Sequence, residues 1–145
     1  MTALGAERSS EYDGMGRLVS STDANGNITR YEYDDSGLLK KTTNADGTFV
    51  ENTYDANGRM LEYSNEEGAV TKYTYSPSGQ VAMKTNALGY TTAYEYDALG
   101  RLTKETDALG GETVYEYDGN GNMTKETNAL GYATVYVYDA ADRLI

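Results

Sequence analysis

The chain has 145 residues, a formal net charge of −11, no cysteine and no histidine. This charge argues against DNA, RNA and anionic lipid surfaces as partners, because those partners require clustered lysine and arginine. Without cysteine and histidine, the chain lacks a disulfide framework, a thiolate metal site, the usual general base and the usual zinc ligand. No signal peptide is recognisable, and no apolar run approaches the roughly 20 residues of a membrane span, so we expect no membrane insertion.

A tyrosine recurs at an interval of 21 residues along the whole chain, and in six of seven copies an aspartate follows it directly. The exception is Tyr75, which is followed by Ser76. A fixed period of this length indicates one small supersecondary unit repeated in an array. We therefore expect a single array over residues 1–145, with about seven units and an incomplete unit at each end. The repeat tyrosines are Tyr12, Tyr33, Tyr54, Tyr75, Tyr96, Tyr117 and Tyr138.

Two turns are predicted in each unit. The chain opens on Thr2–Gly5, which has the pattern of the second turn, and the first full unit has a first turn at Asp13–Gly16 and a second at Asp23–Gly26. Asp, Asn or Ser at the first corner of a type I turn bonds its own backbone, and the glycine takes the positive φ that follows. A type I turn closed by a glycine bulge is a standard hairpin loop. After Gly5, the turn glycines are Gly16, Gly26, Gly37, Gly47, Gly58, Gly68, Gly79, Gly89, Gly100, Gly110, Gly121 and Gly131.

Two short strands are predicted between these turns, as in Tyr90–Tyr96 and Arg101–Thr106. Both are rich in Thr, Tyr or Val with a two-residue alternation, which is typical of strands. The alternation places Thr92, Tyr94 and Tyr96 on one face. The expected fold is all-β, with tandem 21-residue hairpins in one continuous, coiling antiparallel sheet. The other strand of each unit carries a recurring apolar residue: Leu18, Leu39, Met60, Val81, Leu102, Met123 and Leu144.

Little conventional core is expected, since each unit offers about two tyrosines and one leucine or methionine to a shared face. The chain stops inside a strand, at Arg143–Ile145. We expect unpaired strand edges at the two ends, which could pair with flanking repeats or with other copies of the chain.

The repeat resembles a known family. The succession Tyr-Asp, Gly-Arg-Leu, Asp/Asn-Ala-Leu/Asn-Gly and Thr-x-Tyr-x-Tyr-Asp resembles the RHS/YD repeat, and Tyr94–Leu102 (YEYDALGRL) matches its pattern well. The family includes bacterial wall-associated and polymorphic toxins, shell components of insecticidal toxin complexes, and animal teneurins. In these proteins the repeats wind as a long β-ribbon into a hollow shell, which in toxins can enclose a C-terminal effector.

The resemblance implies a non-catalytic structural segment of a larger secreted or cell-surface protein, with no cofactor and with an enclosed effector as one partner. Some features of the family are missing. We find no segment like the self-cleaving core rich in aspartate among these residues, and we expect no effector domain after the repeats. Asn52 replaces a penultimate tyrosine, and Asp142 replaces a turn glycine. With about seven units, the chain alone is not expected to enclose a protein.

Two chemical roles for the carboxylates compete with a structural one. Paired acids could cleave glycosides, but Glu32, Glu95 and Glu116 recur at one strand position, whereas an active site needs one asymmetric constellation. The loops Asp23–Asn27 and Asp118–Asn122 weakly resemble calcium loops, yet turn chemistry accounts for both. We therefore expect no catalytic residue and no metal ligand.

Two further hypotheses concern binding. Tyrosine rings stack on sugars, and Tyr63, Tyr90 and Tyr132 lie off the two main tyrosine positions of the repeat. These three residues are the candidates for a carbohydrate- or receptor-binding surface. The alternative is edge-to-edge self-assembly through the terminal strands.

Overall fold

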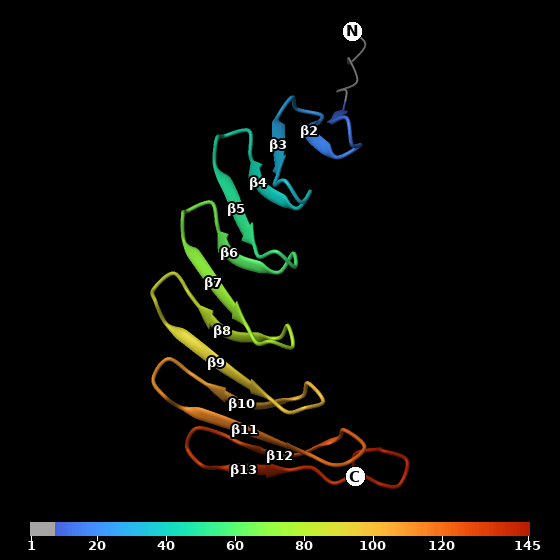
Figure 1. Cartoon of the computed structure of the whole chain (residues 1–145), viewed down its shortest axis with the longest axis vertical. Coiled ribbons are helices and arrows are strands. Elements are labelled where there is room, and N and C mark those ends of the chain that lie inside the picture. The colour runs from blue at the N-terminus through green and yellow to red at the C-terminus, as the bar shows by residue number, and fades with distance from the viewer. Residues whose placement is uncertain (1–7) are drawn as a thin grey trace. The chain divides into compact units, whose positions relative to one another are not determined.

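The computed structural model describes residues 8–145 of the chain, which form thirteen β-strands joined by short turns (Figure 1). The predicted turn at Thr2–Gly5 lies outside these residues. No helix long and apolar enough to cross a membrane occurs in the part of the chain that the structure describes. The strands are β1 Ser9–Tyr12, β2 Leu18–Thr22, β3 Ile28–Tyr33, β4 Leu39–Thr43, β5 Phe49–Tyr54, β6 Met60–Ser64, β7 Val70–Tyr75, β8 Val81–Thr85, β9 Thr91–Tyr96, β10 Leu102–Thr106, β11 Glu112–Tyr117, β12 Met123–Thr127 and β13 Ala133–Val135.

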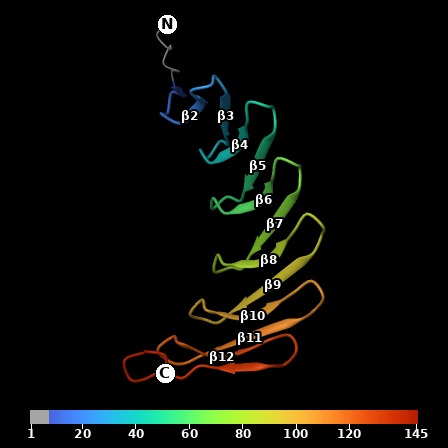
Figure 2. The same ribbon diagram turned by 180° about the vertical axis from the view of Figure 1, so that it is seen from behind.

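The strands are ordered in the sheet as they are in the chain, from β1 to β13, with antiparallel pairing. The predicted all-β fold of tandem hairpins is therefore confirmed. Two compact units can be distinguished, the residues up to Lys72 and Tyr73–Ile145. Within each unit, the first turns lie at one end of the strands and the second turns at the other end, as both views show (Figures 1 and 2).

The predicted turn chemistry is also confirmed. In the first turn, the Gly16 N–H donates to the Asp13 carbonyl at 3.0 Å, and the Asp13 N–H donates to the Arg17 carbonyl at 2.9 Å. All twelve turn glycines that the structure describes have φ between 77° and 96°, in the left-handed region that favours glycine. Asp142, which stands at a glycine position, adopts φ of 56°. The aspartate therefore keeps the turn geometry at the cost of some backbone strain.

A bulge inside five of the hairpins was not predicted. In the first hairpin, Tyr12 pairs with Leu18 and Glu11 with Ser20, so Val19 has no partner residue. An extra residue of this kind interrupts the two-residue alternation and increases the local twist. The bulge has no recognisable sequence pattern, because the strand is short and the bulged residue varies in type. The same shift occurs at Lys40, Leu61, Thr103 and Thr124.

The register separates a tyrosine face from a charged face. In the hairpin of β9 and β10, Tyr96 pairs with Leu102 and Tyr94 with Glu105, so these side chains share a face. On the opposite face, Lys104 Nζ lies 3.0 Å from Glu95 and 2.9 Å from Glu112. Such exposed ion pairs contribute little to stability. Similar pairs join Lys41 to Glu51, Lys72 to Glu62 and Lys125 to Glu116.

No residue between 8 and 145 is buried, which confirms the expectation of little core. The hydrophobic effect scales with the apolar area removed from water, so partial burial on one face gives limited stabilisation per hairpin. The fold must therefore depend on contacts between neighbouring hairpins.

Neighbouring hairpins pair over a short stretch only. The pairs that join β2 to β3 run from Thr22–Ile28 to Ser20–Arg30, so Leu18 lies beyond the ladder. The Tyr33 hydroxyl bridges this gap by donating to the Leu18 carbonyl at 2.8 Å. The same bond joins Tyr54 to Leu39, Tyr117 to Leu102 and Tyr138 to Met123, at 2.8 to 3.0 Å. The repeat tyrosine thus fastens each of these hairpins to the one before it, fifteen residues upstream.

The turn carboxylates are held by several donors. Asp97 Oδ1 accepts from the backbone N–H of Leu99 at 2.9 Å and of Arg101 at 3.0 Å, and Asp97 Oδ2 accepts from Arg101 Nε at 2.7 Å. These bonds, the Arg101 backbone N–H foremost, hold the pKa of Asp97 below its usual value of 3.8. The pKa is lowered likewise, by hydrogen bonds from turn residues, at Asp13, Asp23, Asp46, Asp55, Asp118 and Asp139.

Removing the hydroxyl from Tyr117 should weaken the joint between two hairpins. The substitution Tyr117→Phe keeps the ring but leaves the Leu102 carbonyl without its donor, and we expect a loss of about 1 kcal/mol in the free energy of unfolding. Urea titration followed by circular dichroism measures this loss. Tyr12→Phe is the matched control, because Tyr12 is 63% exposed and its hydroxyl has no hydrogen bond to any residue that the structure describes. Equal stability of Tyr117→Phe and wild type would contradict this role.

Acid should destabilise the fold. A carboxyl whose pKa is lowered by folding stabilises the native state above its unfolded pKa, and this contribution is lost as the pH falls through the folded pKa. We therefore expect the melting temperature to decrease when the pH is lowered below about 5. The substitution Asp97→Asn keeps an oxygen acceptor for the turn but removes one such carboxyl, so its melting temperature should depend less steeply on pH. A melting temperature that rises on acidification would refute this prediction.

Candidate functional site

Two arginines connect their own turn to the next hairpin. Arg17 Nε lies 2.7 Å from Asp13 Oδ2, and its guanidinium carbon lies 4.7 Å from the centre of the Tyr33 ring. A planar guanidinium suits both contacts, because it donates in a fork and stacks on aromatic rings. Sequence reasoning did not find this arrangement, although the recurrence of arginine four residues after the turn aspartate was a visible signal. Arg101 repeats it, at 2.7 Å from Asp97 and 4.8 Å from the centre of the Tyr117 ring.

The residue four places after the start of the first turn differs between copies. Asn122 Nδ2 donates to Asp118 Oδ2 at 3.1 Å, and Gln80 Nε2 donates to the Gly100 carbonyl at 2.6 Å. Leu38 can donate nothing from its side chain. The turn aspartate that precedes Leu38 is Asp34, which accepts from the Leu38 backbone N–H.

Asp34 is a turn aspartate in which only one of the two carboxylate oxygens accepts hydrogen bonds from the turn. Its Oδ1 accepts from the backbone N–H groups of Ser36 and Leu38, at 2.9 Å each. Its Oδ2 has no hydrogen-bond or ion-pair partner among residues 8–145. This carboxylate oxygen can therefore accept from an outside donor.

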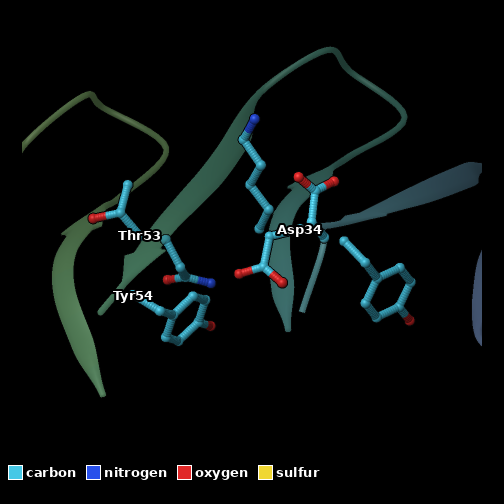
Figure 3. A pocket seen from close by; sticks show the side chains of 7 residues that line it. Asp34, Thr53 and Tyr54 are labelled. Carbon is cyan, nitrogen blue, oxygen red and sulfur yellow. The ribbon is translucent and has the colours of Figure 1, made fainter. Parts of the chain in front are cut away.

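A cavity of about 320 Å³ opens next to Asp34, where β4 and β5 diverge beyond their ladder. In Figure 3, Asp34 lies across the cavity from Thr53 and Tyr54. Its wall is formed by Tyr33, Asp34, Asp35, Lys40, Asn52, Thr53 and Tyr54. The cavity combines carboxylates, an amide and aromatic rings, which suits a ligand with several donors.

Asn52, which lines this cavity, carries an unsatisfied acceptor. Its Nδ2 donates to the Leu39 carbonyl at 3.1 Å. The same carbonyl also accepts from the Tyr54 hydroxyl at 2.9 Å. Its Oδ1 is buried and has no hydrogen-bond partner. Buried polar atoms are nearly always paired, so this oxygen marks a place where a donor is missing. The amide is also shorter than the tyrosine that the repeat pattern expects at this position, and across the ladder it pairs with Tyr63.

The three tyrosines predicted as carbohydrate contacts do not form one site. Tyr63 lies in β6, is 37% exposed and faces the same side as its partners Asn52 and Thr71. Tyr90 and Tyr132 are 56% and 72% exposed, each at the end of a second turn. Gly111 occupies the equivalent position in the turn between them. Each ring is thus available singly.

The carboxylates of the two loops compared with calcium loops are used by the turns themselves. Asp23 Oδ2 accepts from Asn27 Nδ2 at 2.8 Å, and Asp118 Oδ2 accepts from Asn122 Nδ2. In residues 8–145, no group of three or more acidic side chains is arranged to hold a metal ion. The recurring strand glutamates Glu95 and Glu116 pair with lysines of the charged face.

Solved structures show the same fold. A crystal structure of TcdB2-TccC3-Cdc42 matches with a TM-score of 0.77 and 22% identity over 94% of this chain and 9% of that one. The Photorhabdus luminescens Tc holotoxin pore with the mutation TccC3-D651A matches with a TM-score of 0.75 and 22% identity, over 94% of this chain and 8% of that one. This chain thus spans less than a tenth of the length of these chains. No curated protein matches it.

The repeat itself identifies the family. The model of the RHS repeat matches residues 12–48, 54–85, 75–112, 96–133 and 117–145, which together make up most of the chain. Each match includes the repeat tyrosine, its turn and the following strands, the elements that the structure joins into hairpins. The chain belongs to the RHS repeat family.

Proposed function

We propose that this chain is a non-catalytic segment of the wall of a larger RHS-repeat shell. The observation that carries the proposal is the way its hairpins are stabilised. Short ladders join neighbouring hairpins, Tyr33, Tyr54, Tyr117 and Tyr138 add a hydroxyl bond to the hairpin before, and no residue between 8 and 145 is buried. Such a sheet is one layer thick and grows by adding hairpins, which suits a wall.

The partners in this proposal are flanking repeats and an enclosed effector. All residues of β1 and β13 are exposed, and an exposed strand is a template for pairing with further strands. The similar fold occurs within chains more than ten times as long, in toxin complexes. These facts favour a segment of a secreted or cell-surface assembly over an independent enzyme.

Electron microscopy of the full-length natural protein that contains these residues tests the proposal of a shell wall. We expect a hollow particle in which this segment is one stretch of the surface, and a second polypeptide region inside it that resists added protease. A full-length product with an open, extended sheet and no protected region would refute the proposal. Light scattering of the isolated 145 residues is the companion measurement, because edge pairing predicts a mass that increases with concentration.

Carbohydrate binding is the second candidate function, favoured by an open cavity at a second turn. This cavity, of about 420 Å³, is lined by Tyr90, Thr92, Asp107, Ala108 and Leu109. An exposed ring beside a hydroxyl and a carboxylate offers both stacking and hydrogen bonds to a sugar.

A glycan array with purified chain tests this second function. We expect Tyr90→Ala to weaken any binding about tenfold, since a stacked ring contributes on the order of 1 kcal/mol or more. Tyr132→Ala and Tyr63→Ala show whether the other two candidate rings take part. Wild-type chain that binds no glycan, or binding that survives Tyr90→Ala unchanged, would exclude the site.

A further inference from the structure

Two copies of the repeat show how this fold binds a guanidinium group. Around Arg17 and Arg101, a turn carboxylate lies at 2.7 Å and the next tyrosine ring at 4.7 and 4.8 Å. Arg101 Nη1 also donates to the carbonyl of Asp118 at 3.0 Å. The fold thus surrounds a guanidinium with a carboxylate, an aromatic ring and a carbonyl oxygen.

In the copy that starts at Asp34, the chain supplies no guanidinium of its own. Leu38 takes the place of the arginine beside the next turn, since its Cδ1 would lie 3.5 Å from a Cβ at Gly58. Arg17 Nη1 stands in the same relation to Gly37, at 3.6 Å. Leucine fills this space but cannot pair with a carboxylate, so Asp34 Oδ2 stays without a partner in the described chain. Because Asp34 lines the cavity, an outside donor can reach it from there.

The cavity presents acceptors that lack donors. Asp34 and Asp35 bring two carboxylates, and Asn52 brings the buried Oδ1 without a hydrogen bond. This oxygen has almost no exposed surface, so an incoming donor pairs with it only when the Asn52 side chain turns toward the cavity. The ring of Tyr54 lines the same space. These are the kinds of group that hold Arg17 and Arg101.

We propose that this cavity binds the guanidinium group of an arginine side chain from a partner protein. Arginine fits better than lysine, because its planar fork can donate to several acceptors at once and stack on a ring, whereas an ammonium is a compact, strongly hydrated charge. The net charge of −11 would draw a basic partner to this surface. This site is independent of the proposed wall, and either proposal can fail without the other.

Lys40 lowers the affinity of the proposed site for a guanidinium group. It is exposed, lines the cavity and forms no ion pair with any residue that the structure describes. Its positive charge opposes an incoming guanidinium, although Asp34 and Asp35 together outweigh it. Removing this charge with Lys40→Gln should therefore tighten binding.

NMR titration of the 145-residue chain with Nα-acetyl-arginine N-methylamide tests the proposal. We expect saturable shifts of the Asn52 side-chain amide and of the Ser36 and Leu38 backbone amides, with a dissociation constant on the order of millimolar for one exposed side chain. The lysine analogue should bind several times more weakly, and the citrulline analogue, which has the shape without the charge, should leave these amides unchanged. Free arginine provides the other source of the group, and binding by free arginine alone would overturn the assignment to a protein partner.

Three variants complete the test. Asp34→Asn should weaken binding at least about threefold, and its turn should persist because asparagine starts the second turns at Asn44 and Asn65. Asp118→Asn is the matched control, since it removes one charge from a turn whose Asp118 Oδ2 already accepts from Asn122. Leu38→Arg supplies an internal competitor and should abolish binding. Unchanged affinity in Asp34→Asn, an equal loss in Asp118→Asn, or equal shifts with citrulline would overturn the proposal.

Discussion

The bond from the tyrosine hydroxyl to a carbonyl of the preceding hairpin is the contact on which the rest of the structure depends. The ladder between hairpins ends early, and Leu18 and its equivalents lie beyond it. Tyr33 and three further tyrosines close the gap with bonds of 2.8 to 3.0 Å. No residue between 8 and 145 is buried, so these bonds and the arginine–tyrosine contacts hold this end of the strands together. The regular interval of the tyrosines is thus the interval at which joints are needed.

The turns and the joints support one another. The aspartate after the tyrosine closes the turn, and in the copies of Arg17 and Arg101 it also holds the arginine that stacks on the next tyrosine. One side chain therefore acts within its own hairpin and on the following one. Because carboxylate, guanidinium and phenol form a connected group, the energies of their substitutions are not expected to add.

Local chemistry made most of the fold predictable. The spacing of Asp13 and Gly16 determines a turn without reference to the rest of the chain, and the structure has turns and strands where this spacing places them as far as β13. The strand expected at Arg143–Ile145 is only an isolated bridge between Tyr138 and Leu144. The bulge at Val19 could not be predicted, because it depends on how two strands pair. The cavity at Asp34 was also missed, since the effects of Leu38 and Asn52 emerge only when adjacent hairpins are seen together. Tyr63 lies off the two main tyrosine positions of the repeat, and only the strand register shows that it shares their face, by pairing with Asn52.

The exchange of arginine for leucine at position 38 shows how this architecture can diversify. Each hairpin contacts its immediate neighbours, so a change at one joint leaves distant joints as they were. A globular core would spread the strain of such a change over many side chains. Here one copy can lose an internal tie and present its freed acceptors to the outside while the adjacent copies preserve the scaffold. In an array of this kind, the surface chemistry of one copy can change while the other copies stay as they are.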